Sequence, residues 1–311
     1  MISIVVPCKN RIKKLKLCID SIKKAIEKSK KEILVSEYEI IIINDHSDEG
    51  FKENIIEQYP EVRIIDSDGI GPGYARNLGI KNSRGKYIFF TDSDCVVSDD
   101  WIVVGYNSFI ESKSLVIQGI PWLFQKNENQ YLGSQEEKLY ELMFSTYLIP
   151  PYTTMTDSRN LLINKDIVNI MGNEVFSEKS NKATAESRVF GKRCNSYGIQ
   201  ILFNENVKIY HEDSLNMESV CNQKYRHGSG RVEIWNEKPD FQYLKSRYFE
   251  NPINFGVDKK YILPSHFAFL LGYYQNLNDK EELNKFLKFS EHVFEEYGEK
   301  ISNFDYIMKM I

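Results

Sequence analysis

Two carboxylates stand where a buried strand is expected to end, in the segment Asp92-Ser93-Asp94. The preceding run from Tyr87 to Phe90 is apolar or aromatic, which is typical of a strand covered by helices on both faces of a parallel sheet. Ligand-binding loops of such sheets lie at the carboxyl ends of the strands. Mg²⁺ and Mn²⁺ commonly bind one or two carboxylates together with the phosphates of a substrate. The segment therefore predicts a divalent cation and a substrate that carries a diphosphate.

Polar residues follow two other predicted strands near the start of the chain. Pro7 ends the first strand, and Asn10 and Arg11 come next, where they can hydrogen-bond a base or a ribose. Asp45 ends the second strand, and its carboxylate can accept a hydrogen bond from a ligand N–H group. A helix N-cap is the alternative role in this loop, although Ser47 or Asp48 suits that role better than Asp45.

A tight turn, Gly71-Pro72-Gly73, leads into a helix predicted to begin near Tyr74. Such a turn brings backbone N–H groups and a helix N-terminus toward a ligand. Arg76 lies in the first turn of this helix, where a cation opposes the helix dipole. Its position therefore favours a nearby anion, with a surface-exposed arginine as the alternative.

The elements that must position these residues alternate along the first half of the chain. Short apolar runs and longer amphipathic segments follow one another as Ile2–Val6, Leu15–Lys30, Glu39–Ile43, Phe51–Tyr59, Val62–Ile65 and Tyr74–Asn82. This alternation predicts an α/β fold built from βαβ units. Residues Trp122–Thr156 change in composition and are predicted to shape a substrate site, a strand returns at Ile199–Tyr210, and helices follow Pro239.

Composition and charge narrow the class of protein. With 311 residues, 42% of them hydrophobic, the chain can bury one large core, alone or with a smaller appendage. A net charge of -4 argues against a nucleic-acid binder, and five scattered cysteines fit free thiols in a reducing compartment. The N-terminus reads as a strand and not as a leader, and the apolar stretch Tyr261–Tyr274 is shorter than the roughly 20 residues of a membrane span. We therefore predict a cytoplasmic protein without a transmembrane segment, able to associate with the inner face of a membrane.

Taken in order, four segments resemble the nucleotide-sugar site of family 2 glycosyltransferases. They are Val5–Arg11, Ile43–Ser47, Gly71–Gly79 and Thr91–Asp94, and the resemblance extends over roughly the first 240 residues. It implies a GT-A fold, which is a Rossmann-like mixed sheet flanked by helices. It also implies that a sugar is transferred from a nucleotide, with UDP expected, to a hydroxyl group with inversion of the anomeric carbon.

The resemblance assigns roles to individual residues. It implies nucleotide binding by Pro7, Asn10, Arg11, Asp45, Gly73, Arg76, Asn77, Asp92 and Ser93. In this set Asp45 would accept a hydrogen bond from uracil N3–H, and Asp92 would contact the ribose and the metal shell. Asp94 is implied as a direct ligand of Mn²⁺ or Mg²⁺ and His211 as a further protein ligand from downstream, with a surface histidine as the alternative for His211.

The catalytic base is where the chain departs from the family pattern. Members usually present Glu-Asp before an aromatic residue or leucine and an arginine, whereas this chain has Glu186-Ser187-Arg188. Serine is a poor base at neutral pH unless a partner activates it. We therefore assign Glu186 as the base that takes the proton of the acceptor hydroxyl. The alternative is that Glu186 only orients the acceptor or pairs with an arginine.

The donor and acceptor pocket is predicted from three further segments. Arg159 and Asn160 resemble the family segment that lines the sugar pocket, with Asn160 as the candidate contact to a donor-sugar hydroxyl. Trp122 follows another strand and could stack on a sugar ring, although a core position is the alternative. Lys224, Arg226 and Arg231 could close over the diphosphate as a basic lid, with a solvated helix end as the alternative.

The domain prediction is a glycosyltransferase domain over 1–240 and a helical extension over 241–311, which dimerises or holds the acceptor. The acceptor is expected to be a glycan, a lipid-linked or a protein hydroxyl, in the synthesis of cell-surface or secreted glycans. The segment Gln223–His227 lacks the tryptophan of processive polymer synthases, which favours transfer of a single sugar. Two alternatives stay open: a nucleotide-sugar sensor without catalysis, and a sugar nucleotidyltransferase. The second is expected to have a glycine-rich phosphate loop directly after the first strand, and this chain lacks those glycines.

Overall fold

The structure is a computed structural model that describes residues 1–69, 71–124, 130–178, 185–211, 216–234 and 259–297, together with residues 240, 242, 246 and 257. The chain divides into two compact units. The first contains residues 1–125, 143–181 and 186–213, and the second contains residues 126–142, 182–185 and 214–311. Helix α5 (Gln130–Thr146) runs from the second unit into the first. The predicted boundary near residue 240 stays a prediction.

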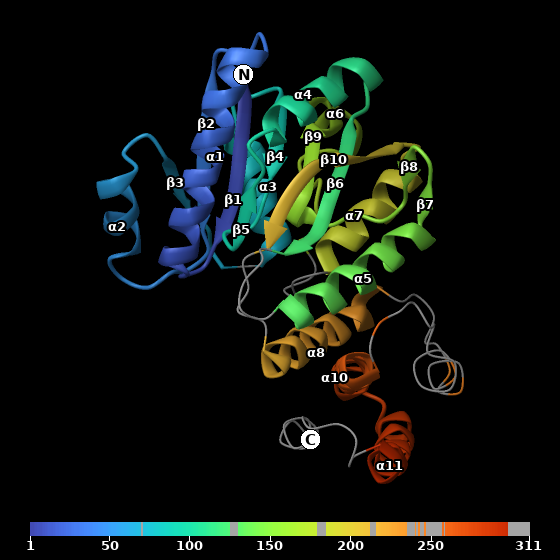
Figure 1. The fold of residues 1–311 in the computed structure, drawn as a ribbon. Helices are drawn as coiled ribbons and strands as arrows, with labels where there is room; N and C mark the ends of the chain where they lie inside the picture. Colours follow the sequence, from blue (N-terminus) through green and yellow to red (C-terminus); the bar gives the residue numbers. More distant parts are fainter. Residues whose placement is uncertain are drawn as a thin grey trace. The chain divides into compact units, whose positions relative to one another are not determined.

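The first unit is built around one mixed sheet (Figure 1). Its strands are β1 (Ile2–Cys8), β2 (Tyr38–Asn44), β3 (Arg63–Asp66), β4 (Tyr87–Phe90), β5 (Cys95–Val97), β6 (Val116–Phe124), β7 (Leu148–Ile149), β8 (Tyr152–Thr153), β9 (Leu161–Asn164) and β10 (Ile201–His211). They are ordered β3-β2-β1-β4-β9-β6-β10-β8-β7, and β5 pairs with β10. The first four are mutually parallel, whereas β9 runs antiparallel to both β4 and β6. The predicted α/β fold with a mixed sheet is confirmed.

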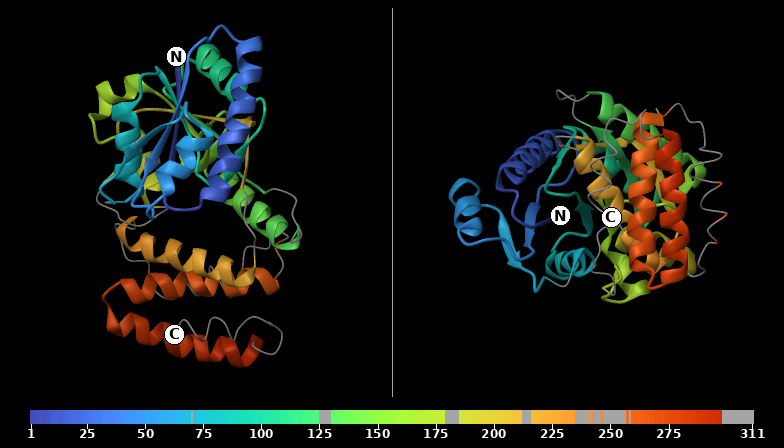
Figure 2. Two further views of the ribbon diagram at one scale, coloured as in Figure 1. Left: turned by 90° about the vertical axis from the view of Figure 1, so that its left-hand side faces the viewer. Right: turned by 90° about the horizontal axis from the view of Figure 1, so that it is seen from below.

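Helices cover both faces of this sheet (Figure 2). They are α1 (Ile12–Glu32), α2 (Phe51–Gln58), α3 (Pro72–Asn82), α4 (Trp101–Ser112), α6 (Val168–Met171) and α7 (Ala185–Ser196), with short 3₁₀ turns at Ser158–Asn160 and Lys165–Ile167. Strand β4 shows why its sequence is apolar throughout: Phe89 packs into the core beneath α1 and α4, while Ile88 and Phe90 pack into the core beneath α3 and α7. All three side chains are fully buried. The strand is therefore buried on both faces, as its sequence predicts.

The predicted alternation of elements matches the observed one closely. Each of the six runs in the first half of the chain overlaps the helix or strand expected there, with shifts of at most three residues at either end. The segment around Pro150 and Pro151 forms a short hairpin, β7 and β8, because the two prolines follow the end of α5 and cannot continue it.

The second unit is helical in its described part. It contains α8 (Met217–Ile234), α10 (Lys259–Asn276) and α11 (Lys280–Tyr297). The left view of Figure 2 shows α10 lying between α8 and α11. Close packing of α8 and α10 depends on Gly228 and Gly272, because a Cβ at either would lie about 2 Å from a backbone oxygen of the other helix. Asp279 caps α11 through its carboxylate and the backbone N–H of Glu282 (3.1 Å). Across the described residues, no helix is both long enough and apolar enough to cross a bilayer.

Candidate active site

The loop after β4 carries Asp92 and Asp94 at the edge of the sheet. Because β1 and β4 are parallel neighbours with Val5 opposite Phe90, their carboxyl ends open at the same place. This register brings Arg11, which follows β1, to Asp94, and the guanidinium contacts Oδ2 of that carboxylate. Arg11 is about half exposed, whereas Asp94 is buried. The structure thus joins the ends of β1 and β4 as the sequence predicts.

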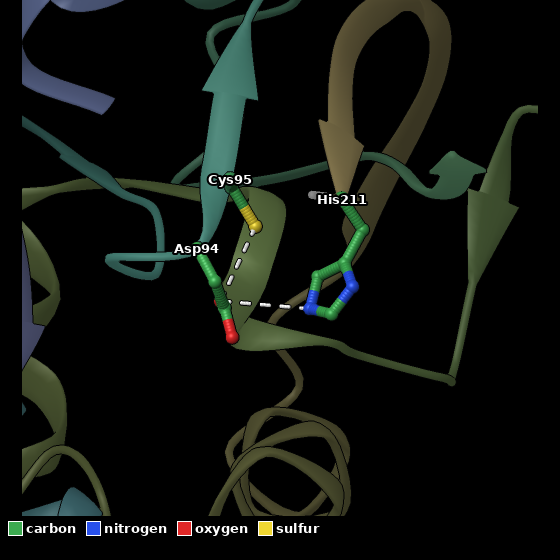
Figure 3. Close-up of side chains that lie close together, drawn as sticks. All are labelled: Asp94, Cys95 and His211. Atoms are coloured by element: carbon green, nitrogen blue, oxygen red, sulfur yellow. Dashed lines mark hydrogen bonds and ion pairs between the residues drawn. The ribbon is translucent and has the colours of Figure 1, made fainter. Parts of the chain in front are cut away.

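His211 approaches Asp94 from the opposite side. It ends β10, and its Nε2 lies 3.5 Å from Oδ1 of Asp94, with both side chains buried (Figure 3). Burial on its own raises the pKa of Asp94, but the imidazole of His211 and the guanidinium of Arg11 outweigh burial and hold that pKa below its usual value. The carboxylate is therefore ionised and ready to bind a cation. His211 lies in the site and not on the surface.

These groups fit a divalent cation. One ligand atom each from Asp94, Cys95 and His211 lies within 4.8 Å of the others. Carboxylate oxygen and imidazole nitrogen suit Mn²⁺ and related first-row metals, and the remaining positions of such an ion are normally filled by water and phosphate oxygens. Burial raises the pKa of the Cys95 thiol well above its usual value, so this thiol is neutral.

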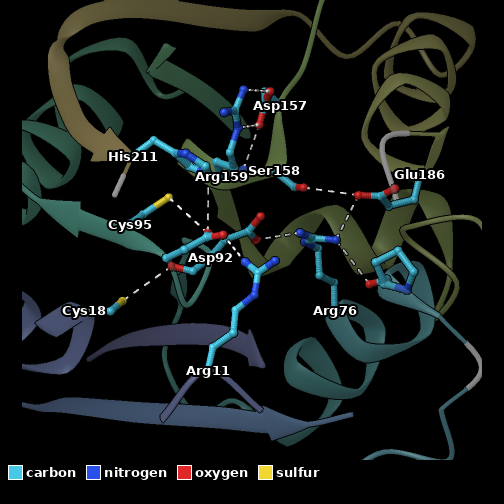
Figure 4. A network of polar contacts seen from close by, with 12 residues as sticks. Arg11, Cys18, Arg76, Asp92, Cys95, Asp157, Ser158, Arg159, Glu186 and His211 are labelled. Carbon is cyan, nitrogen blue, oxygen red and sulfur yellow. Dashed lines mark hydrogen bonds and ion pairs between the residues drawn. The ribbon is translucent and has the colours of Figure 1, made fainter. Parts of the chain in front are cut away.

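Arg76 bridges the two parts of the site (Figure 4). Its Nη2 lies 2.9 Å from Oδ1 of Asp92, and its Nη1 lies 3.0 Å from Oε1 of Glu186. The side chain is 4% exposed, which excludes the alternative of a surface arginine. The sequence predicts an anion near Arg76, and in the structure this anion is a pair of carboxylates. Burial raises the pKa of Asp92, although Arg76 opposes that shift.

Glu186 lies in the first turn of α7 and is almost completely buried. Its Oε1 accepts hydrogen bonds from Arg76 and from the hydroxyl of Ser158, the latter at 3.3 Å. Within the described part of the chain, Oε2 has no hydrogen-bond partner. Burial raises the pKa of Glu186 despite the neighbouring guanidinium. A carboxylate with one uncommitted oxygen and a raised pKa is suited to accept a proton.

Ser187 follows Glu186 in the first turn of α7. Its backbone oxygen accepts a hydrogen bond from the hydroxyl of Thr156, and its side chain is buried. The residue after Thr156, Asp157, is a carboxylate that sequence reasoning missed. The guanidinium of Arg159 holds it with two hydrogen bonds, of 2.9 Å to Oδ1 and 2.7 Å to Oδ2, and the backbone N–H of Arg159 donates a third to Oδ1 (3.0 Å). Burial on its own raises the pKa of Asp157, but the charge and hydrogen bonds of Arg159 outweigh burial, and this pKa falls to about 2.

Two signals in the sequence could have found the missed residues. The spacing Asp157-x-Arg159 allows a carboxylate and a guanidinium to close on each other across one 3₁₀ turn. Cys95 directly follows a predicted metal ligand, and any residue in that position begins the next strand beside the site. Neither signal is a recognised motif, and both need the fold to become interpretable.

Two asparagines and one glycine prove to brace the scaffold. Asn160 is fully buried, and both of its amide hydrogens go to backbone oxygens, those of Ile120 (2.8 Å) and Val207 (2.9 Å). This disagrees with the predicted contact to a donor-sugar hydroxyl, because the amide joins strands of the sheet. Asn77 is similarly committed to the backbone of Phe176. At Gly73 a Cβ would lie 2.1 Å from the backbone oxygen of Ser177, so glycine is needed for this close approach.

The loops after β1 and β2 line a pocket together. Its walls are formed by Asn10, Arg11, Ile12, Lys13, Lys14, Asp48, Glu49 and Phe51. Asn10 holds the two loops in place, since its Oδ1 accepts a hydrogen bond from the backbone N–H of Asp48 (2.8 Å). Asp45 is half-buried and accepts a hydrogen bond from Ser67 (3.0 Å). The N-cap of α2 is Gly50, and not Asp45, Ser47 or Asp48. This corner offers cations and polar groups beside the metal-site loop.

The remaining predicted residues have the following positions. Pro7 lies within β1 opposite Ile43, and Ser93 is buried in the metal-site loop beside the Cys8 thiol. Trp122 is part of β6, but its side chain lies outside the described atoms. On α8 of the second unit Arg226 is exposed, Arg231 is half-buried, and Lys224 is buried with its Nζ 2.7 Å from Oε1 of Glu136. The assignment of these residues to a lid stays a prediction.

Comparison with known proteins identifies the family. A family model described as "Glycosyl transferase family 2" matches residues 3–172, which is more than half of the chain. This chain therefore belongs to glycosyl transferase family 2, as its four motifs predict.

Three curated relatives illustrate how far the similarity extends. The glycosyltransferase GlyA of Streptococcus pneumoniae is 30% identical over 149 residues, which are 45% of this chain and 20% of that protein. The poly(ribitol-phosphate) beta-N-acetylglucosaminyltransferase TarP of Staphylococcus aureus is 32% identical over 122 residues, which are 38% and 36% of the two chains. The glycosyltransferase AglE of Haloferax volcanii is 21% identical over 243 residues, which are 75% and 74%. The chain thus spans about a fifth of GlyA and about three quarters of AglE.

Solved structures with the same fold include a mannosyltransferase, PcManGT from Pyrobaculum calidifontis, in complex with GDP-Man and Mn²⁺. It superposes with a TM-score of 0.55 at 11% identity, over 99% of this chain and 84% of that one. S. aureus TarS residues 1–349 in complex with UDP gives a TM-score of 0.50 at 18% identity, over 89% and 81% of the two chains. At these identities the likeness bears on the fold alone, and it agrees with the predicted GT-A architecture.

Proposed function

We propose that this protein is an inverting, metal-dependent glycosyltransferase that moves a single sugar from a nucleotide donor, UDP-linked, to a hydroxyl acceptor. One observation carries the proposal: a metal-suited pair, Asp94 and His211, and a buried carboxylate with a raised pKa, Glu186, meet at one edge of the sheet. Arg76 joins the two halves through Asp92. Family membership and the solved mannosyltransferase with GDP-Man and Mn²⁺ support the same chemistry.

Asp94 and His211 would hold the cation, Mn²⁺ or Mg²⁺. When bound, it would supply positive charge to the diphosphate as that group leaves the sugar. Arg11 adds a second positive charge beside Asp94, and Lys13 and Lys14 line the neighbouring pocket. A nucleoside diphosphate carries the opposite charge, so this corner favours it. Asp45, at the end of β2, is assigned to the N3–H of the uracil base.

Glu186 is assigned as the base. In the proposed step the acceptor hydroxyl gives its proton to Glu186 while its oxygen forms a bond to the anomeric carbon. The bond from that carbon to the diphosphate oxygen breaks, and the diphosphate leaves with the bonding electrons. Burial favours the protonated form of Glu186, which increases its affinity for the proton. Arg76 keeps the carboxylate in position through Oε1 and leaves Oε2 for the acceptor.

The sensor hypothesis has one observation in its favour. Ser187 stands where family members usually have a second acid, and its surroundings in the described structure are those of a structural residue. A protein that had lost its base would still bind a nucleotide sugar. We favour catalysis because Glu186 supplies a buried carboxylate one residue away. The acceptor is proposed to be a glycan, a lipid-linked or a protein hydroxyl.

A binding and turnover experiment tests the proposal. Calorimetric titration with UDP and a panel of nucleotide sugars, with and without Mn²⁺, should show one preferred UDP-sugar whose binding needs the metal. Asp94→Ala should abolish the Mn²⁺-dependent part of UDP binding, whereas Asp99→Ala, at an exposed aspartate after β5, should not change it. Unchanged affinity in Asp94→Ala would remove the metal-site assignment. Binding without donor hydrolysis or transfer to any hydroxyl acceptor would favour the sensor.

A further inference from the structure

The strand after the metal-site loop places a thiol beside the two assigned ligands. Strand β5 pairs antiparallel with the end of β10, and in this register Cys95 lies directly opposite His211. Side chains of directly opposed residues extend from the same face of a sheet, with Cβ atoms about 4.5 to 5.5 Å apart. Asp94 precedes Cys95, so its carboxylate reaches the same point from the loop. Backbone pairing, and not a chance rotamer, therefore brings the three side chains together.

The three ligand atoms converge on one spot (Figure 3). Sγ of Cys95 lies 4.0 Å and Nε2 of His211 lies 3.5 Å from the same oxygen, Oδ1 of Asp94. Around a tetrahedral metal with bonds of about 2.0 to 2.3 Å, ligand atoms are separated by roughly 3.4 to 3.6 Å. The observed separations differ from this by a few tenths of an ångström. Arg11 contacts the other oxygen, Oδ2, and so leaves Oδ1 to face the thiol and the imidazole.

We propose that Cys95 is a third protein ligand of the cation, beside Asp94 and His211, and that it makes the site prefer Co²⁺ and Zn²⁺ over Mg²⁺. This inference rests on the proposed function for the assignment of Asp94 and His211, and it adds a ligand and a metal preference. Thiolate sulfur is a soft ligand that suits Zn²⁺ and Co²⁺, whereas Mg²⁺ takes oxygen ligands and water. The thiol loses its proton to the buffer as the metal–sulfur bond forms.

All five cysteines are buried, so few other thiols can compete for added metal. Cys18 provides a nearby control, because its Sγ lies 3.6 Å from the backbone oxygen of Asp92 in the same loop. It is buried like Cys95, but it is not among the three converging groups. Replacing it removes a buried thiol close to the site without removing a proposed ligand.

Cobalt spectroscopy tests the proposal on the full chain without nucleotide or acceptor. Co²⁺ added to the wild-type protein should give a thiolate-to-cobalt charge-transfer band in the near ultraviolet. Cys95→Ser should lose the band, while Cys18→Ser should keep it. In competition titrations Cys95→Ser should weaken Zn²⁺ binding at least about tenfold, as even outer-shell changes at metal sites can do, and should leave Mg²⁺ binding within about threefold.

Three outcomes would overturn the inference. The wild-type protein could bind Co²⁺ in calorimetry without any charge-transfer band, which needs no variant and so does not depend on folding of Cys95→Ser. The band could persist in Cys95→Ser. The wild type could bind no Co²⁺ at all, which would also remove the assignment of Asp94 and His211. If the wild-type protein shows the cobalt band but transfers no sugar in a separate assay, that result would count against the proposed function alone.

Discussion

Nη1 of Arg76 lies 3.0 Å from Oε1 of Glu186, although 110 residues separate the two in the chain. Both side chains are about 4% exposed, so the pair is removed from water. Removing one partner of such a buried ion pair strongly destabilises the folded protein, because the other charge stays buried without compensation. The pair therefore both positions the proposed base and couples that base to the stability of the first unit.

We expect Glu186→Gln to bind donor with unchanged affinity and to lose transfer. Glutamine keeps the shape and can still hydrogen-bond, but it cannot accept the acceptor proton, so kcat should fall roughly 10²- to 10⁴-fold. In the wild type, burial raises the pKa of Glu186, so activity should rise with pH through a value above the ordinary glutamate pKa near 4.3. Steady-state kinetics across pH and calorimetry with the donor measure both effects.

The exposed glutamate Glu174, on the same unit, provides the control for that experiment. Glu174→Gln should leave kcat and its pH profile unchanged. Full activity in Glu186→Gln would move the base to another residue, and an unchanged pH profile with lower kcat would indicate a purely positioning role for Glu186.

Arg76→Met should destabilise the first unit. It leaves Glu186 and Asp92 without their shared cation, and breaking a buried pair on one side costs about 3 to 5 kcal/mol. Adding Glu186→Gln to Arg76→Met should recover part of the loss, because the buried charge is then neutralised. Urea unfolding of the two single variants and the double variant forms the cycle that measures this coupling. Strictly additive losses would mean that the two side chains do not interact in solution.

Much of this site is predictable from sequence because its residues follow strands. Asp92 and Asp94 follow an apolar run, Arg11 follows another, and parallel strands open at one edge, so their meeting needs only the strand pattern. His211 is predictable only through the family resemblance, since 117 positions separate it from Asp94 and its place depends on where β10 ends.

Other parts depend on contacts that no local pattern encodes. Asn160 appears as a sugar ligand in the sequence, yet its hydrogen-bond partners are the backbone oxygens of Ile120 and Val207, which only the assembled sheet brings to it. The antiparallel strand β9 breaks the parallel order for the same reason, because its neighbours are set by the whole topology. Cys95 is a candidate ligand only because it pairs across the strands with His211, and this pairing cannot be read from two positions so far apart in the sequence.

Asp157 should make stability depend on acid pH. Its folded pKa is about 2, below the unfolded value near 3.9, so the contribution is fully present above the unfolded pKa and is lost as pH falls through 2. A shift of this size corresponds to roughly 2 kcal/mol at neutral pH. We expect the difference in unfolding free energy between wild type and Asp157→Asn to shrink as pH falls from about 5 to 2. Asp99→Asn, at an exposed aspartate, is the control: its difference in unfolding free energy from wild type should not vary with pH in this way. A difference for Asp157→Asn that stays constant with pH would contradict the ion pair with Arg159.

Gly228→Ala should destabilise the second unit, although alanine normally makes a helix about 1 kcal/mol more stable than glycine does. A Cβ at this position of α8 would lie 1.8 Å from the backbone oxygen of Phe269 on α10, so the helices would have to separate. Overpacking of this kind typically costs 1 to 3 kcal/mol, which exceeds the gain in helix propensity. Gln223→Ala, at a half-buried position of the same helix, controls for the altered sequence. Thermal unfolding followed by circular dichroism should show a lower midpoint for Gly228→Ala alone; an equal or higher midpoint would mean that α8 and α10 do not pack this closely in solution.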